Sequence, residues 1–597
     1  MTATPAAGSR AVGAATIAEA FRITAEDHPD RVAVRTKDDE VSLTWSELRD
    51  RVDALARGLH ELGVRRGDTV ALMLANRPEF HIADLAAMSL GATPFSIYAT
   101  SSAEQISYVV GHAKAKVAII EELFAERFSA CRPDLPDLEH VVVLEGAQGE
   151  GTMAWADVEG RESGFDVDAA WRAVEPEDLI TLIYTSGTTG PPKGVQLVHR
   201  NLMAATQGVE QLIRFPDGSK VISWLPSAHI AERMAHHYLP IVYAMTITCC
   251  PNPREVVAYL PAVKPTWFFA VPRIWEKLKA GMEAYLASGE GAEQKRAWLD
   301  AAMRKVELEQ AGEPVPEDLA ATVAEADAQL FTGIRAMLGF DEIAAVNVGA
   351  APTPREVLVF FHAIGVPLAE LWGMSETCGA GACNPPEKIK IGSVGPPTPG
   401  VEAKLGEDGE LLVRSDVVMT GYRNLPDRTS EALDADGWLH TGDIATIDDD
   451  GYITIVDRKK ELIINAAGKN MSPANIESEL KGASPLIGQA CVIGDGRSYN
   501  TALIVLDADF APAFAAQHGL EGKGLEELAG EQAILAAVQQ GVDKANDRLS
   551  RVEQVKRFTI IPGDWAPGGE ELTPTMKLKR RPIAEKYAGE IETMYER

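Results

Sequence analysis

The chain has 597 residues, 46% of them hydrophobic and 24% charged, which is typical of a folded protein of several domains rather than a disordered one. Its 57 Lys and Arg stand against 87 Asp and Glu, so the formal net charge is −30 at pH 7. This charge argues against a nucleic-acid binder, because such proteins carry broad basic surfaces. A protein this acidic that handles phosphates must use a few local cations.

The cysteines and the apolar runs indicate where the protein resides. Six cysteines are too sparse for a disulfide framework in a chain of this length. The first residues are rich in Ala, Gly, Ser and Thr and lack the apolar core of a signal peptide. No apolar run approaches the ~20 residues that a membrane-spanning helix needs. We therefore expect a cytoplasmic protein with reduced thiols and no transmembrane segment.

Strands and helices alternate along the first part of the chain. Residues 16–61 predict a helix, a strand and a second helix, for which Thr44 is the candidate N-cap. Short apolar runs at 68–74, 116–120 and 141–144 predict buried strands, with helical segments between them. This alternation predicts an α/β fold whose parallel sheets are covered by helices on both faces.

The pattern changes twice towards the C-terminus. Residues 289–339 are charged and rich in Ala and Glu with helical periodicity, which predicts a pair of surface helices. From about Val401 strands predominate, and Asp448-Asp449-Asp450-Gly451 predicts a hairpin turn. We expect a large N-terminal body with a small β-rich subdomain at residues 1–457, followed by a small α+β domain at 458–597.

One loop carries the strongest chemical signal. An apolar strand runs into Thr185-Ser186-Gly187-Thr188-Thr189-Gly190, and Lys193 follows. Glycines let backbone N–H groups approach a phosphate, hydroxyls donate further hydrogen bonds, and a lysine adds positive charge. The spacing differs from that of a Walker A loop. The alternative, a flexible turn without function, does not account for so long a run of small and hydroxyl residues.

Together with this loop, later motifs make the sequence resemble the adenylate-forming enzymes, the family of acyl-CoA synthetases, luciferases and peptide-synthetase adenylation domains. The resemblance covers nearly the whole chain in the family's order, and its further motifs are Asn347-Val348-Gly349-Ala350-Ala351-Pro352, Leu371-Trp372-Gly373-Met374-Ser375-Glu376-Thr377, Gly437-Trp438-Leu439-His440-Thr441-Gly442-Asp443, Asp457-Arg458 and Pro574-Thr575-Met576-Lys577-Leu578-Lys579-Arg580.

The resemblance implies an ATP site and a magnesium site. It places the pyrophosphate of ATP at the loop from Thr185 to Gly190 and at Lys193. It implies that Asp443 and Arg458 bind the ribose, that Glu376 binds Mg²⁺, and that Thr185 is a second candidate for the metal. The residues it implies near adenine are Gly349, Ala350, Ala351, Pro352, Trp372, Gly373, Met374 and Ser375. An aromatic face at Trp372 suits stacking, and a carboxylate suits Mg²⁺.

The resemblance also implies a mobile C-terminal domain with the main catalytic residue. In the family, a lysine in the position of Lys577 contacts the attacking carboxylate and the α-phosphate, and thus stabilises charge that develops in the transition state. Lys460 lies where the family has its hinge, so we expect the hinge at 457–460. After adenylate formation the small domain would rotate and coenzyme A would attack the acyl-adenylate.

Two further motifs resemble long-chain fatty-acid–CoA ligases in particular, namely Leu225-Pro226-Ser227-Ala228-His229-Ile230-Ala231-Glu232-Arg233 and Val271-Pro272-Arg273-Ile274-Trp275-Glu276-Lys277. His229 is a catalytic candidate near the acyl carboxylate; a metal site with His236 and His237 is the alternative. Ile464 departs from the family, since many members carry a lysine there.

We therefore predict an ATP- and Mg²⁺-dependent long-chain fatty-acid–CoA ligase. Two alternatives stay open: a fatty-acyl-AMP ligase that loads a carrier protein, and a catalytically silent binding protein of the same fold. The expected partners are a long-chain fatty acid, ATP and CoA, without nucleic acid. Weak peripheral membrane contact and a homodimer are further expectations at the level of the family.

Overall fold

The first part of the chain forms parallel strands with helices on both faces, which confirms the predicted α/β class. The computed structural model describes residues 9–147, 149, 151–161, 163–185, 191–466 and 469–596. A five-stranded sheet has the order β4–β3–β5–β6–β7, and every neighbouring pair in it is parallel. Its strands are β3 (Thr69–Met73), β4 (Thr93–Ser96), β5 (Ala115–Ile120), β6 (His140–Val143) and β7 (Thr152–Ala154).

Strand β3 shows how both faces of this sheet are covered. Leu72 belongs to the large apolar cluster that includes α3 (Pro78–Ser89). Its neighbour Met73 belongs to a second cluster, which includes α4 (Ala103–Ala113). Because successive side chains of a strand point to opposite faces, the two clusters lie on opposite sides of the sheet.

Three further sheets complete the body around the candidate site. They are β10–β11–β1–β2, β12–β13–β14–β15 and β18–β9–β8. Their strands are β1 (Val32–Thr36), β2 (Ser42–Thr44), β8 (Leu179–Thr185), β9 (Lys193–Val198), β10 (Lys220–Ser223), β11 (Thr246–Cys249), β12 (Trp267–Ala270), β13 (Ala345–Val348), β14 (Leu368–Trp372), β15 (Ala382–Cys383) and β18 (Gly421–Tyr422).

The β-rich segment after Val401 is an antiparallel sheet of the order β16–β17–β19–β20. Its strands are β16 (Glu402–Leu405), β17 (Glu410–Arg414), β19 (Leu439–Ile447) and β20 (Ile453–Arg458). The predicted hairpin turn joins β19 to β20 and is confirmed. Asp448 accepts hydrogen bonds from the backbone of Asp450 and Tyr452, and Gly451 has a φ of 82°.

Helices enclose these sheets. Thr44 caps α2 (Trp45–Glu61) as predicted, in a reciprocal capping box with Glu47. The charged segment 289–339 forms α13 (Ala292–Ala311) and α14 (Glu317–Ala326), which contact each other and confirm the predicted helical pair. The other helices up to residue 457 are α1 (Ile17–Asp27), α5 (Ala125–Cys131), α6 (Trp155–Glu159), α7 (Val167–Arg172), α8 (His199–Leu212), α9 (Ile230–Arg233), α10 (Leu239–Tyr243), α11 (Val256–Val263), α12 (Pro272–Leu286), α15 (Thr332–Met337), α16 (Arg355–Ala363) and α17 (Pro426–Ala432).

The C-terminal segment has sheets and apolar clusters of its own. Its strands are β21 (Ile463–Ile464), β22 (Asn470–Met471), β23 (Ile487–Ile493), β24 (Asn500–Leu506) and β25 (Val555–Ile561), and its helices are α18 (Pro473–Ala483), α19 (Phe510–Gln517), α20 (Leu525–Leu528), α21 (Gln532–Arg548), α22 (Arg580–Lys586) and α23 (Ala588–Tyr595). Among the described residues, no apolar cluster joins the chain up to Ile455 with the chain from Ile463 onwards. This separation supports our proposal of a domain boundary just after Asp457.

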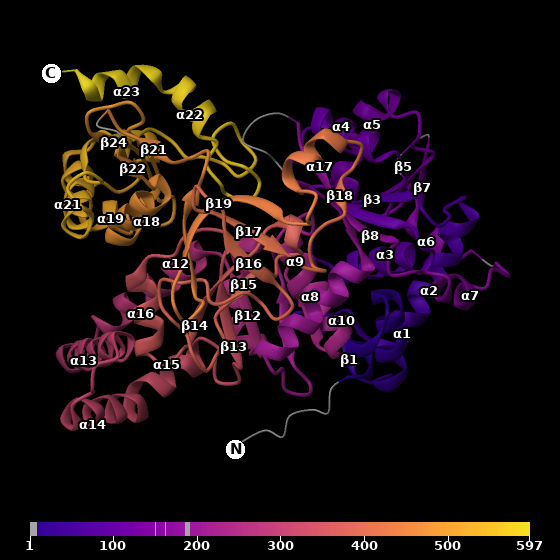
Figure 1. Ribbon diagram of the computed structural model, residues 1–597, viewed down its shortest axis with the longest axis horizontal. Coiled ribbons are helices and arrows are strands. Elements are labelled where there is room, and N and C mark those ends of the chain that lie inside the picture. Colours follow the sequence, from indigo (N-terminus) through magenta and orange to yellow (C-terminus); the bar gives the residue numbers. More distant parts are fainter. Residues whose placement is uncertain are drawn as a thin grey trace.

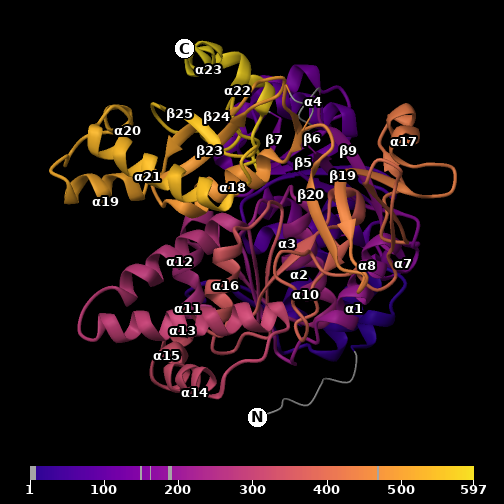
Figure 2. The same cartoon turned by 60° about the vertical axis from the view of Figure 1, so that its left-hand side comes forward.

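The C-terminal segment, orange to yellow in Figure 1, lies over one side of the larger body. In both views its helix α18 lies next to α12 of the body (Figures 1 and 2). Within the described ranges, no helix has the length and apolar character required to cross a membrane.

Candidate active site

The predicted phosphate loop joins two paired strands. Thr185 ends β8 and Lys193 begins β9, and the two residues lie opposite each other in the antiparallel ladder. The residues that flank the predicted loop are therefore fixed by the pairing of β8 with β9. Ser186, Gly187, Thr188, Thr189 and Gly190, which make up the predicted loop itself, lie outside the described residues.

Lys193 faces an aromatic ring and a carboxylate. Its Nζ lies 4.0 Å from the ring centroid of Tyr422, close enough for a cation–π interaction. Burial lowers the pKa of Lys193, and attraction to Glu376 partly opposes this effect. The lysine thus lies in a partly desolvated position within electrostatic reach of Glu376.

Glu376, the predicted magnesium ligand, is buried in a short turn after β14. Its side chain is 6% exposed, and its Oε1 accepts a hydrogen bond of 2.7 Å from the hydroxyl of Tyr422. Tyr422 belongs to none of the sequence motifs that predict this site. Tyr422 reaches the site because β18 pairs with β9, with Tyr422 opposite Val195, and no local pattern predicts this pairing.

Three of the predicted site residues lie in contact with one another: Trp372, Asp443 and Arg458. Asp443 and Arg458 are cross-strand partners on β19 and β20, and the Arg458 Nε lies 2.8 Å from Asp443 Oδ1. The indole N–H of Trp372 donates to Asp443 Oδ2 over 2.8 Å. Burial raises the pKa of Asp443, while Arg458, Trp372 and Lys577 counteract the rise. Contacts with Trp372 on one oxygen and Arg458 on the other thus fix the orientation of the Asp443 carboxylate.

Close backbone packing holds the two predicted adenine motifs together. Gly349 follows β13, and a side chain there would place its Cβ 2.9 Å from the Leu371 side chain. Ala350 has a φ of 70°, in the left-handed region that a non-glycine residue rarely adopts. A Cβ at Gly373 would lie 2.3 Å from the backbone of Gly379.

These two motifs therefore lie at the carboxyl ends of neighbouring parallel strands, β13 and β14. Ligands of open α/β sheets commonly bind at that edge. The exposed residues of the first motif, Ala350, Ala351 and Pro352, and the second motif's Met374 and Ser375 surround this position.

Lys577, in the C-terminal segment, lies within electrostatic reach of Asp443, Arg458 and Glu376. Its loop is tight: the Lys577 backbone N–H donates to Thr573 Oγ1 over 3.0 Å, and Met576 has a φ of 65°. The side chain keeps an exposed surface, yet the surrounding protein lowers its pKa by desolvation first and by repulsion from Arg458 second. Asp443, Glu461 and Glu376 act in the opposite direction. Lys577 thus lies within electrostatic reach of both the predicted ribose residues and the predicted metal residue.

His229 lies within electrostatic reach of Lys577. Burial lowers the pKa of His229 to about 4, and repulsion by Lys577 adds to the effect. Its Nδ1 accepts the backbone N–H of Ala231 over 3.1 Å at the start of α9, so a proton on the neutral ring resides on Nε2. His229 is therefore a neutral imidazole around pH 7.

The alternative of a metal site with His236 and His237 is not supported. His236 contacts Glu232 over 2.7 Å, and His237 contacts Asp84 over 3.0 Å, both in the protein interior. Within the described ranges, no three His, Cys, Asp or Glu side chains gather as they would around a metal ion.

Lys460 and Ile464 follow β20 directly. Lys460 is exposed in a turn between β20 and β21, where the hinge is predicted. Ile464 is 50% exposed on β21, so its apolar side chain occupies a surface position where many family members carry a lysine.

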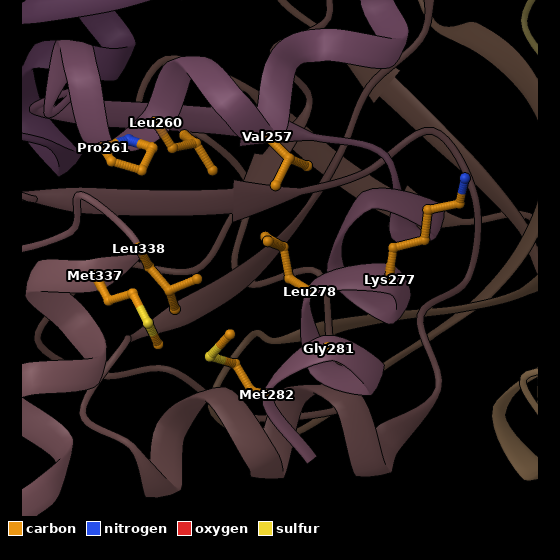
Figure 3. Close-up of a pocket in the computed structure, with 9 residues that line it drawn as sticks. All are labelled: Val257, Leu260, Pro261, Lys277, Leu278, Gly281, Met282, Met337 and Leu338. Atoms are coloured by element: carbon orange, nitrogen blue, oxygen red, sulfur yellow. The ribbon is translucent and has the colours of Figure 1, made fainter. Parts of the chain in front are cut away.

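An apolar pocket of about 260 Å³ lies elsewhere, among α11, α12 and α15 (Figure 3). Leu260, Leu278, Met282 and Met337 are among the residues that line it. It shares no residue with the candidate site, so we do not assign the acyl chain to it.

Comparisons with known proteins identify the family. Residues 21–423 match the family of AMP-binding enzymes, and residues 460–597 match the C-terminal domain of AMP-binding enzymes. A protein named fadD11 from Mycobacterium tuberculosis is 49% identical over 74% of this chain and 79% of its own length. The long-chain-fatty-acid–CoA ligase FadD15 of Mycobacterium bovis is 35% identical over 95% of each chain.

A solved structure shares the fold. The anthranilate CoA ligase AuaEII, crystallised with anthranoyl-AMP, superposes with a TM-score of 0.75 over 97% of this chain and 98% of its own, at 19% sequence identity. With both family segments matched in order, this chain belongs to the AMP-binding, adenylate-forming enzymes.

Proposed function

We propose that this chain is an AMP-forming long-chain fatty-acid–CoA ligase. In the first step a carboxylate oxygen of the fatty acid attacks the α-phosphorus of ATP, and pyrophosphate leaves. In the second step the sulfur of CoA attacks the acyl carbon, the thiol proton is lost, and AMP leaves. The single observation that carries the proposal is that Lys577 lies within electrostatic reach of Asp443, Arg458, Glu376 and His229.

Lys577 and His229 have complementary roles in the first step. The ammonium of Lys577 can stabilise the charge that builds up on the α-phosphate and hold the attacking carboxylate near it. A cationic histidine so close would repel Lys577. The neutral His229 instead offers its Nε2–H as a hydrogen-bond donor to the acyl carboxylate, without competing for the phosphate charge.

ATP is the proposed nucleotide substrate. In this proposal the carboxylate of Asp443, which Trp372 and Arg458 orient, accepts hydrogen bonds from the ribose hydroxyls. Trp372 and the Gly349–Pro352 turn are the proposed contacts of adenine. Lys193 is the proposed cation for the terminal phosphates, because it begins the strand that follows the phosphate loop. In this way a protein with a negative net charge can bind the triphosphate of ATP through three local cations, Lys193, Arg458 and Lys577.

The residues present fit a magnesium ion bound together with the nucleotide. The buried carboxylate of Glu376 is a hard oxygen ligand, which the hydroxyl of Tyr422 orients. Thr185 is a second candidate at the end of β8. A magnesium ion bound here would neutralise part of the phosphate charge.

The acceptor and the acyl chain length are tested together. Purified enzyme is given ATP, Mg²⁺ and CoA with fatty acids of 6 to 20 carbons, roughly the range of short to long chains, and AMP is followed. We expect CoA-dependent AMP release with a maximum for long chains such as palmitate. Adenylate that accumulates regardless of CoA would instead indicate a ligase that loads a carrier protein, and no pyrophosphate release with any acid would indicate a silent binding protein.

The proposal also covers the location, the membrane contact and the oligomeric state of the enzyme. Long-chain fatty acids partition into bilayers, so we propose a cytoplasmic enzyme with weak peripheral membrane contact. A homodimer is the proposed oligomeric state. Flotation with vesicles and sedimentation of the purified chain test these two points.

A further inference from the structure

The motif at the start of α12 has no role in the site described above. It contains Arg273 and Lys277, which are four residues apart on one helix and therefore lie on the same face. Trp275 and Leu278, on another face, are buried in the large apolar cluster. The two cations consequently point away from the core of the N-terminal body.

Both cations contact the C-terminal segment. Arg273 forms an ion pair with Asp507, and Lys277 forms one with Asp509. Side-chain exposure is 25% for Arg273 and 10% for Asp507, so water screens this pair less than an ordinary surface pair. Arg273 is also fixed from its own helix by Glu276, at 3.0 Å.

The Asp507 carboxylate is fixed in direction by its own backbone. It follows β24, and its Oδ1 accepts the N–H of Asp509 over 3.1 Å and that of Phe510 over 2.9 Å at the start of α19. Its Oδ2 is thereby directed at Arg273. The aspartates at the start of α19 thus meet the two cations near the start of α12.

A second contact lies alongside the first. Arg548, at the end of α21, pairs with Glu356 on α16. On α18, a Cβ built at Gly482 would lie 3.0 Å from the Cβ of Pro354. Pro354 lies two residues after the turn at Gly349–Pro352, so the C-terminal segment packs against the chain that follows the proposed adenine turn. Helix α12 lies beside α18 in Figure 2.

We propose that Arg273 and Lys277 are positioning residues for the first half-reaction. By pairing with Asp507 and Asp509 they set the orientation of the C-terminal domain in which Lys577 lies within electrostatic reach of Asp443 and Glu376. The inference rests on the proposed function, because only a two-step ligase gains from holding one orientation and then leaving it. These pairs separate when the domain turns for the CoA step.

The test measures the two half-reactions separately in the full-length chain. Asp507→Asn removes the charge but keeps the Oδ1 acceptor at the start of α19, and Arg273→Gln changes the other partner. We expect palmitate-dependent ATP–pyrophosphate exchange to fall about 5- to 10-fold in each variant. Formation of palmitoyl-CoA from supplied palmitoyl-adenylate and CoA should stay unchanged or rise.

Two controls separate orientation from folding. Lys305→Gln breaks the Lys305–Glu309 pair, which is of the same kind but lies within α13, and should change neither half-reaction. The double variant of Asp507 and Arg273 should lose no more exchange activity than either single variant, because both remove one interaction. Higher ionic strength should reduce exchange more in the wild type than in the double variant.

An equal loss in both half-reactions, or no loss in either, overturns the proposal. If Asp507→Asn does not fold, the test rests on Arg273→Gln, in which pyrophosphate exchange should fall while palmitoyl-CoA formation does not. The proposed function fails by a different observation, namely wild-type enzyme that makes adenylate without CoA-dependent AMP release. The exchange measurement then still tests the positioning role.

Discussion

The ammonium of Lys577 lies in surroundings that oppose its charge. Desolvation and Arg458 both lower its pKa, so the folded protein gains little from this cation. We predict that Lys577→Ala lowers the rate of pyrophosphate release about 10²- to 10³-fold, the range for loss of one preorganised donor. The melting temperature should change little, since the side chain is exposed and repelled by Arg458.

The same variant should leave the second step intact. With palmitoyl-adenylate and CoA supplied, Lys577→Ala should make palmitoyl-CoA at nearly the wild-type rate. Pyrophosphate release at the wild-type rate in this variant would remove Lys577 from the mechanism.

The lowered pKa of Lys577 has a consequence for pH dependence. Its pKa lies below the ordinary 10.5, and the protonated form is the active one. The value of kcat/KM for ATP, which reports the free enzyme, should therefore fall with rising pH earlier than an ordinary lysine would cause. In Lys577→Arg the residual activity should keep its plateau to higher pH, because guanidinium stays protonated. An alkaline limb at the same pH in both proteins would assign the ionisation to another group.

At the scale of elements, the turn between β14 and β15 decides where Trp372 lies. A Cβ at Gly381 would lie 2.2 Å from ring atom Cζ3 of Trp372. We predict that Gly381→Ala displaces the indole, weakens its hydrogen bond to Asp443, and destabilises the protein by about 1–3 kcal/mol, as overpacking does. The KM for ATP should rise about tenfold or more, measured by pyrophosphate release beside thermal unfolding.

A matched substitution is available at Gly333 on α15, where nothing lies within 4 Å of a new Cβ. Gly333→Ala should leave the KM for ATP unchanged and stabilise the protein by up to about 1 kcal/mol, as expected in a helix. If both alanine variants bind ATP alike, the contact between Gly381 and Trp372 does not position the adenine site.

Elements set by local chemistry are the ones that the sequence predicts well. The N-cap at Thr44, the helices within 289–339 and the turn at Asp448–Gly451 depend on neighbouring residues, and each is found in the structure. In the site, Trp372, Asp443 and Arg458 come from motifs and do meet.

What escapes prediction depends on pairing between distant segments. Tyr422 reaches Glu376 because a two-residue strand pairs with β9, more than 200 residues away. Such short strands carry no periodicity of their own. Likewise, the pairing of Arg273 with Asp507 depends on how the segments before and after Asp457 pack against each other. The sequence shows the cations of α12 only as part of a motif.

At the scale of the whole molecule, charge and contact are distributed unevenly. Residues 458–597 hold 18 basic and 20 acidic side chains, so nearly all of the net −30 belongs to the larger body. At one part of the interface Arg273 and Lys277 of the acidic body meet two aspartates of the nearly neutral segment, while Arg548 of that segment meets Glu356 of the body. Long-range repulsion is therefore weak, and specific short-range pairs can set the orientation.

A covalent link across the same interface should stop the cycle after its first step. The ideal Cβ of Gly482 lies 3.0 Å from that of Pro354, so a shift of about half an ångström allows a disulfide between Pro354→Cys and Gly482→Cys. The six native cysteines are free and buried, which limits competing links. The oxidised double variant should form palmitoyl-adenylate and pyrophosphate but release no AMP with CoA, and reductant should restore full turnover. Each single variant, oxidised in the same way, should turn over normally. Full turnover of the linked protein would mean that both steps proceed in the orientation described here, and the domain rotation would have to be abandoned.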